Sequence, residues 1–111
     1  MLLFLYGSLL DPATLARRSG DPTLPGRGHP ALLAGRQRVA LARVPFPTLR
    51  RKPRGRVKGL AIRVSAAALR RLNAYEGPTY RLTRVVVATP RGKTAAWTWI
   101  APGGTRRPWN G

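Results

Sequence analysis

Very few side chains of this sequence can take part in acid–base chemistry. The 111 residues include three acids, Asp11, Asp21 and Glu76, one histidine, His29, and no cysteine. The lack of cysteine excludes disulfides, thiolate metal sites, iron–sulfur clusters and cysteine nucleophiles. A single histidine cannot build a multi-histidine metal site. We therefore expect neither a metal nor a cofactor, and an acid–base enzyme with this sequence must work with very few groups.

The three acids stand in different local contexts. Asp11 and Asp21 each precede a proline, a pattern typical of helix capping and turn initiation, so we expect a structural role for both. Glu76 follows a predicted helix, at the negative end of the helix dipole where a cation would be favoured. The dipole should raise the pKa of Glu76 and neighbouring cations should lower it. Glu76 is therefore either a surface or salt-bridged residue or an acid retained for its chemistry.

A loop near the N-terminus is the other place where the sequence suggests binding. The apolar run 1–6 ends at Gly7-Ser8, shortly before a predicted helix. Such a loop exposes successive backbone N–H groups and can bind an anion, although it lacks the sequence of a Walker loop; the alternative is a simple strand end. Ser8 has no positioned base in sequence, so we do not expect a serine triad. His29 is interpreted as a loop residue without a catalytic role.

Hydrophobic periodicity predicts the elements that must position these residues. Five strands are expected, at residues 1–6, 32–44, 57–64, 80–89 and 94–100. Two short helices are expected, at residues 12–18 after the cap Asp11 and at residues 66–75 after the cap Ser65. Trp97 and Trp99 should share one face of the last strand.

The segments between these elements complete the predicted organisation. Residues 46–54, with two prolines and a basic cluster, are interpreted as a loop, and residues 90–93 as a hairpin turn. The tail 102–111 is expected to be loosely ordered. Residues 1–111 are thus predicted to form a single α+β domain, a small mixed β-barrel or sheet with short flanking helices.

The charge of the chain favours a different kind of partner. Lysine and arginine total 21 against three acids, which gives a net charge of +18 and a pI near 12.0. Such a charge is typical of nucleic-acid binding, and basic residues cluster at Arg50, Arg51, Lys52, Arg54, Arg56 and Lys58. No known nucleic-acid-binding signature is present. The apolar start lacks the features of a signal peptide and is too short for a membrane span, so we expect a cytoplasmic protein without a membrane partner.

Two segments far apart in sequence resemble one known family. They are LFLYGSLLDPATL, at residues 3–15, and LRRLNAYEGPTYRLTRV, at residues 69–85. With GRVKGL at residues 55–60 and the final tryptophan-bearing strand, their order resembles the gamma-glutamylcyclotransferase-like family. The resemblance implies a small β-barrel with flanking helices, and an enzyme that cleaves a gamma-glutamyl amine or peptide and releases 5-oxoproline.

The resemblance also implies a site. Glu76 would be the catalytic acid–base, and the substrate-binding residues would be Tyr6, Gly7, Ser8, Leu9 and Tyr80. The partner would be a small gamma-glutamyl molecule, and no metal or cofactor is implied. Asn73 departs from the aspartate usual in the family, residues 49–58 are unusually basic, and the C-terminal end is short. The alternatives are a basic nucleic-acid-binding module on the same scaffold without catalysis, and an inert interaction protein.

Overall fold

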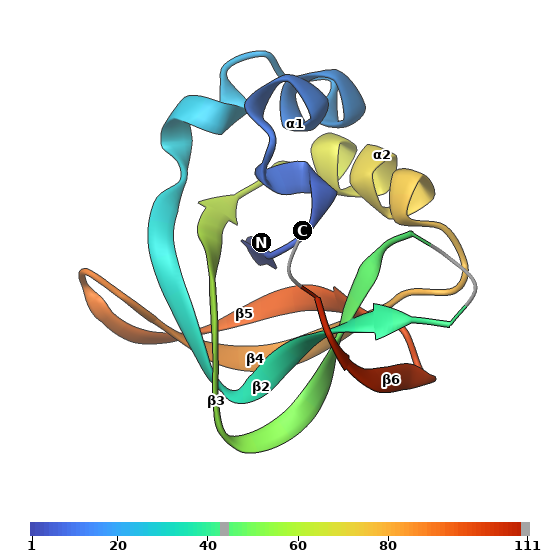
Figure 1. The fold of residues 1–111 in the computed structure, drawn as a ribbon. Coiled ribbons are helices and arrows are strands. Elements are labelled where there is room, and N and C mark those ends of the chain that lie inside the picture. The colour runs from blue at the N-terminus through green and yellow to red at the C-terminus, as the bar shows by residue number, and fades with distance from the viewer. Residues whose placement is uncertain (43–44, 110–111) are drawn as a thin grey trace.

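The computed structural model of this chain describes residues 1–42 and 45–109, and its elements are shown in Figure 1. In chain order they are β1 (Leu2–Leu5), the 3₁₀ helix η1 (Ser8–Leu10), α1 (Pro12–Ser19), the 3₁₀ helix η2 (Leu24–Arg27), β2 (His29–Leu41), β3 (Pro47–Arg63), α2 (Ala66–Glu76), β4 (Arg81–Thr89), β5 (Gly92–Ile100) and β6 (Gly104–Pro108).

Five of the strands close into a barrel. The strand order is β3–β1–β5–β4–β2, and β2 also pairs with β3, which joins the two edges of the sheet. The barrel is mixed because β1 and β5 run parallel and the other neighbours antiparallel. β6 extends the sheet by pairing with β2. The expected α+β class, a small mixed barrel with short flanking helices, is confirmed.

β1 is buried on both faces, as the apolar run predicts. Side chains alternate along a strand, and Phe4 and Tyr6 accordingly join the core inside the barrel. Leu3 and Leu5 join a second core, between the barrel and the helices. The loop that follows β1 therefore begins where the two cores meet.

Both α-helices begin at their predicted caps. A carboxylate oxygen of Asp11 accepts a hydrogen bond from the N–H of Thr14 at 3.0 Å. The Ser65 hydroxyl accepts one from the N–H of Ala68 at 3.1 Å. α1 and α2 lie side by side on one face of the barrel (Figure 1). Leu72 of α2 is fully buried against that face. Packing against it holds the C-terminal end of α2 beside the end of β1.

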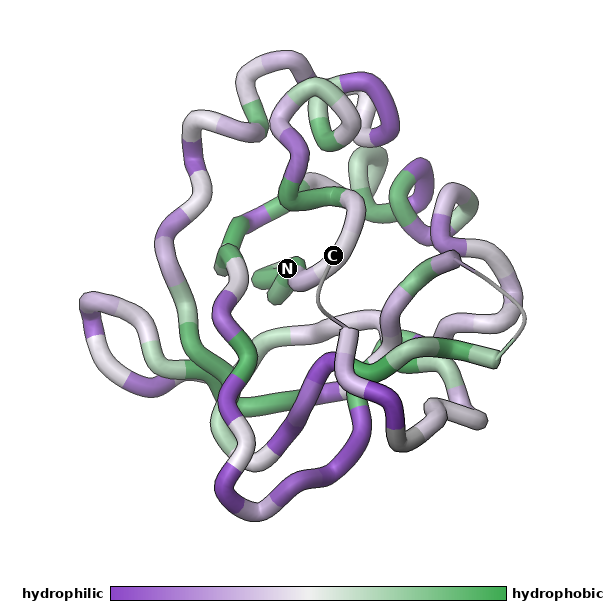
Figure 2. Tube along the Cα trace, in the orientation of Figure 1, coloured by the Kyte–Doolittle hydropathy of each residue, from purple (hydrophilic) through white to green (hydrophobic). Residues whose placement is uncertain are grey.

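The expectation of a loop at residues 46–54 is wrong from Pro47 onward, because Pro47–Arg63 is one long strand paired with β2. Its prolines stand where a strand tolerates them. Pro47 is the first residue of β3, and Pro53 lies where the register between β2 and β3 shifts. Gly35 faces this irregularity with a φ of +81°. The bent tip of this hairpin is strongly hydrophilic (Figure 2).

Two further expectations are corrected at the edges of β2. His29 is the first residue of β2, paired with Ala61, rather than a loop residue. The tail is not loosely ordered at Gly104–Pro108, which pairs with β2 as β6. The N–H of Trp109 also donates to the carbonyl oxygen of Arg38 at 3.1 Å. Residues 110–111 of the expected tail and 43–44 of the expected strand lie outside the described residues.

The β4–β5 hairpin is confirmed, with a turn at Pro90-Arg91 between the paired residues Thr89 and Gly92. Trp97 and Trp99 share a face by strand alternation, but their exposure differs. Trp99 is 3% exposed because it packs into the core beneath the helices, whereas Trp97 is 36% exposed. None of the helices in residues 1–42 and 45–109 has the length and apolar character needed to cross a membrane.

Candidate active site

A cavity of about 110 Å³ opens where the end of β1 meets the end of α2. Residues from six parts of the fold line it, because the barrel brings these strand and helix ends together. The cavity is bounded by all six residues that the resemblance implied, Tyr6, Gly7, Ser8, Leu9, Glu76 and Tyr80. Segments that are distant in sequence meet at this cavity. Ser8 and Tyr75, for example, are 67 residues apart, and their hydroxyl groups form a hydrogen bond.

The loop side of the cavity is made by Gly7 and η1. The N–H of Leu10 donates to the carbonyl of Gly7 at 3.0 Å, which makes this the first hydrogen bond of the 3₁₀ turn. The N–H groups of Ser8 and Leu9 precede it, and the first N–H groups of a helix have no partner within the helix. The loop can therefore offer backbone donors to an anionic group in the cavity.

Tyr6 and Tyr80 hold the walls of the cavity in place. The Tyr6 hydroxyl donates a hydrogen bond to the Trp99 carbonyl, which ties the end of β1 to the end of β5. The Tyr80 hydroxyl donates to the Pro47 carbonyl at 2.8 Å and ties the start of β4 to β3. Burial raises the pKa of both phenols above the usual range, more strongly for Tyr6. Both side chains are therefore neutral hydrogen-bond donors at ordinary pH.

Glu76 is the last residue of α2 and its carboxyl group borders the cavity. The helix ends here because Gly77 adopts a φ of +81° and its N–H bonds back to the Asn73 carbonyl at 3.1 Å. Burial raises the pKa of Glu76 from 4.5 to about 7. Among the described residues the ion pair is that of Arg27 with Asp21, and Glu76 takes part in none. Burial, which withdraws water from the charged carboxylate, is therefore the cause of its raised pKa.

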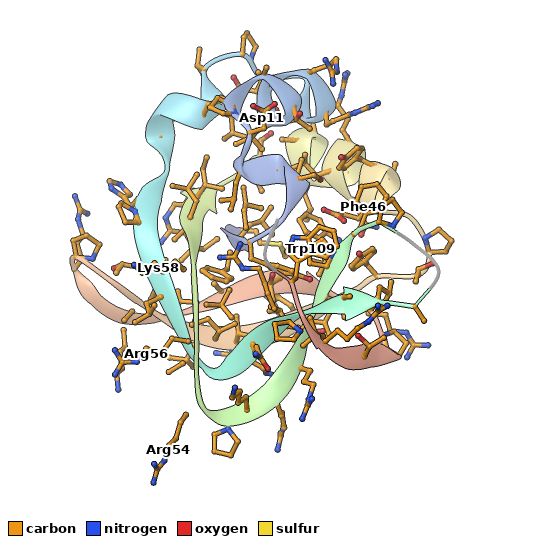
Figure 3. All side chains as sticks on the ribbon, in the orientation of Figure 1. Asp11, Phe46, Arg54, Arg56, Lys58 and Trp109 are labelled. Atoms are coloured by element: carbon orange, nitrogen blue, oxygen red, sulfur yellow. The ribbon has the colours of Figure 1, made fainter. Side chains whose placement is uncertain are left out.

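Several cavity residues were missed by sequence reasoning. They are Tyr75, Phe46, Pro47, Thr98 and Trp99, together with the β1 residues Phe4 and Leu5. Tyr75 could have been found, since it precedes Glu76 directly in the motif. Phe46 has no such signal: it stands in the segment interpreted as a loop, and tertiary pairing of β2 with β3 brings it beside the end of α2 (Figure 3).

Tyr75 connects the loop, α1 and α2. Its hydroxyl shares a hydrogen bond with the Ser8 hydroxyl at 2.8 Å. The guanidinium carbon of Arg18 lies 4.9 Å from the centre of the Tyr75 ring, a cation–π geometry. Tyr75 therefore links the Ser8 loop to Arg18 of α1 through its two ends.

Asn73 stands where the family usually has an aspartate, and its side chain still makes a contact that links α2 to the barrel. Its side-chain oxygen accepts a hydrogen bond from the indole N–H of Trp99 at 3.0 Å. An amide oxygen can accept this bond as a carboxylate oxygen would. The contact links the last turn of α2 to β5, so it helps to position Glu76 one turn further along the helix.

The other acids and the histidine lie away from this cavity. Hydrogen bonds from Thr14 to Asp11, and from Thr23 to Asp21, lower the pKa of each carboxyl. These contacts give Asp11 the capping role expected for it and place Asp21 in a turn. Within residues 1–42 and 45–109 no three His, Cys, Asp or Glu side chains gather as metal ligands.

Comparison with known proteins agrees with this arrangement. A family model described as gamma-glutamyl cyclotransferase, AIG2-like, matches residues 3–110, and the chain therefore belongs to that family. Protein AIG2 C of Arabidopsis thaliana is 31% identical over 106 residues, which cover 88% of this chain and 61% of that protein. The chain thus spans less than two thirds of this curated relative.

Solved structures show the same fold. A protein of Arabidopsis thaliana determined in solution matches with 31% identity and a TM-score of 0.77, covering 90% of this chain and 61% of the other. A solved gamma-glutamyl cyclotransferase matches with a TM-score of 0.77 over 94% of this chain and 68% of its own. Its identity is 19%, so this likeness speaks for the fold alone.

Proposed function

We propose that the protein is a gamma-glutamylcyclotransferase-type enzyme that acts on a gamma-glutamyl amine or peptide and releases 5-oxoproline. The observation that carries the proposal is the position of Glu76, the only glutamate of a chain with a net charge of +18. It borders a small cavity opposite the Tyr6–Leu9 loop, without a cation to pair with among the described residues. Family membership supports the same class of reaction.

The loop would hold the glutamyl part of the substrate. The N–H groups at the start of η1 would donate to its α-carboxylate, since they have no partner within the 3₁₀ turn. Ser8 and Tyr75 would add hydroxyl groups beside these N–H groups. A cavity of about 110 Å³ suits a glutamyl head group, with the leaving amine directed outward past Phe46 and Pro47.

Glu76 would move the proton that the reaction requires. Its carboxylate accepts a proton from the substrate's α-ammonium group, and the freed amine attacks the γ-carbonyl carbon. The ring nitrogen of the resulting five-membered intermediate then loses a second proton to solvent. The C–N bond to the leaving amine breaks as the carbonyl re-forms, and the Glu76 carboxyl returns its proton to the departing nitrogen. A pKa of about 7 suits both steps, because general acid–base catalysis is most effective when the pKa lies near the working pH.

The remaining acceleration would come from the arrangement of the substrate itself. Nucleophile and electrophile belong to one molecule, so holding the glutamyl chain in a folded conformation brings the amine to the carbonyl. Intramolecular reactions of this kind reach effective molarities of roughly 10⁵–10⁸ M. The chemistry needs no protein nucleophile and draws on one carboxyl group, which is what the cavity contains.

The proposal is tested by measuring 5-oxoproline release from a panel of gamma-glutamyl dipeptides and gamma-glutamyl alkylamines. Glu76→Gln should lower kcat by about 10²-fold or more with little change in KM, because the amide keeps the shape but cannot accept the proton. Asp21→Asn is the matched control, since it removes a carboxylate from a turn outside the cavity, and it should retain full activity. Unchanged turnover in Glu76→Gln would contradict the mechanism.

A further inference from the structure

A second and larger cavity lies at the opposite end of the barrel. Its volume is about 610 Å³, and its apolar floor includes Leu2 at the start of β1 and Ala61 near the end of β3. The first cavity borders the other ends of β1 and β3, at Tyr6 and Pro47. The two cavities share no lining residue.

The rim of this second cavity is basic. Arg27, His29, Arg63, Arg91 and Lys93 line it, and no Asp or Glu does. They come from η2, from the starts of β2 and β5, from the end of β3 and from the β4–β5 turn, so the tertiary fold gathers them. One carboxylate, Asp21, reaches this group through its ion pair with Arg27. The other basic groups lining the cavity are not neutralised by a carboxylate among the described residues.

The β4–β5 turn presents its cations in a defined geometry. The Thr89 hydroxyl accepts a hydrogen bond from the N–H of Arg91 at 3.2 Å and donates one to the carbonyl of Gly92 at 3.0 Å. Gly92 adopts a φ of +110°, which completes the tight turn. Arg91 and Lys93 therefore stand on a hydrogen-bonded turn at the edge of the cavity rather than on an irregular loop.

We propose that this second cavity binds a small polyanion that carries two or more linked phosphate groups. Cations around a concave surface repel one another and produce a positive potential inside it. A multivalent anion bound there would reduce the repulsion and neutralise the potential. Arginine forms paired hydrogen bonds with phosphate oxygens, and lysine adds a point charge. Among the described residues no Phe, Tyr or Trp lines the cavity, so it lacks the large aromatic rings that nucleobase sites commonly use. The ligand is recognised by its phosphates.

Calorimetric titration with inorganic triphosphate tests this site on the full chain, at physiological ionic strength. Wild-type protein should bind one triphosphate. Arg63→Gln and Arg91→Gln should each weaken binding about tenfold or more, because each removes charge-assisted hydrogen bonds. Arg56→Gln is the matched control: Arg56 is an exposed residue of the same strand as Arg63 and lies outside the cavity. It should change the affinity less than twofold.

Two results would overturn the proposal. One is an equal loss in Arg56→Gln and Arg63→Gln, which would indicate attraction by the overall charge. The other is binding of single-stranded RNA without binding of triphosphate, which would identify an extended nucleic-acid surface. ATP provides a further comparison, and it should bind no more tightly than triphosphate because no Phe, Tyr or Trp among the described lining residues is available to stack on its base. The assay is separate from 5-oxoproline release, so failure here leaves the proposal for the first cavity unchanged.

Discussion

At the scale of single residues, the three carboxyl groups of this protein have three different environments. Asp11 caps α1, Asp21 accepts hydrogen bonds in a turn and pairs with Arg27, and Glu76 borders the first cavity. Hydrogen bonds lower the pKa of both aspartates, whereas burial raises that of Glu76. The environment therefore separates two structural acids from the one carboxyl group that titrates near neutral pH.

The raised pKa of Glu76 predicts a pH-dependent contribution to stability. Between pH 4.5 and about 7 the unfolded chain releases this proton while the folded protein keeps it. The free energy of unfolding should therefore fall by about 3 kcal/mol as pH rises through this window, relative to a variant without the group. Urea unfolding of wild type and Glu76→Gln at pH 4 and pH 8 measures this difference. Parallel stability profiles of the two proteins would contradict it.

At the scale of elements, close approach between β1 and β3 shapes the barrel beside the first cavity. Gly59 of β3 leaves room for the Phe4 ring, since a Cβ atom there would lie 2.2 Å from the carbonyl oxygen of Leu5 and 2.7 Å from that ring. Phe4 occupies the space that a side chain at Gly59 would need. The strand that ends at the loop is thus packed tightly against its neighbour, and this fixes where the loop begins.

Gly59→Ala should consequently destabilise the fold. The added methyl group meets backbone as well as an aromatic ring, so we expect the free energy of unfolding to fall by about 2 kcal/mol or more. Gly26→Ala is the control, because a Cβ atom at Gly26 meets nothing within 4 Å. It should leave stability unchanged or slightly increased. Chemical denaturation of the two variants makes the comparison, and equal effects would show that the close approach is unimportant.

At the scale of the whole molecule, charge is the dominant feature. The chain has 21 basic residues and three acids, and its described residues form the single ion pair of Arg27 with Asp21. Arg54, Arg56 and Lys58 project outward from the β2–β3 hairpin (Figure 3). Arg36 and Arg51 are direct partners across the same hairpin, an unfavourable arrangement of like charges. Folding therefore gathers cations that repel one another.

Salt should accordingly stabilise this protein. At 0.01 M ionic strength the screening length of about 30 Å exceeds the radius of gyration of 13.2 Å, so all charges interact. At 0.1 M it falls to about 10 Å. The Tm should rise by at least about 4 °C over this range of NaCl, which corresponds to about 1 kcal/mol. The double variant Arg54→Gln/Arg56→Gln should show a smaller rise. A Tm that falls or stays constant in wild type would refute the argument.

The amino-acid sequence by itself determined the features that depend on neighbouring residues. The apolar run 1–6, the caps Asp11 and Ser65 and the β4–β5 hairpin follow from periodicity, capping and turn chemistry, which act over a few positions. The motifs around Gly7 and Glu76 indicated the family in the same way, because they can be read directly from the chain.

Tertiary structure alone decided what depends on distant partners. Residues 47–54, with their two prolines, lack a strand pattern of their own, and they form part of β3 because β2 supplies the hydrogen bonds. Residues 104–108 become β6 for the same reason. Glu76 acquires its pKa of about 7 only when the barrel and helices exclude water from it. The basic rim of the second cavity likewise exists only in the folded chain, since its residues come from segments far apart in sequence. Pairing, burial and charge gathering are long-range effects, so they arise only when the whole barrel closes.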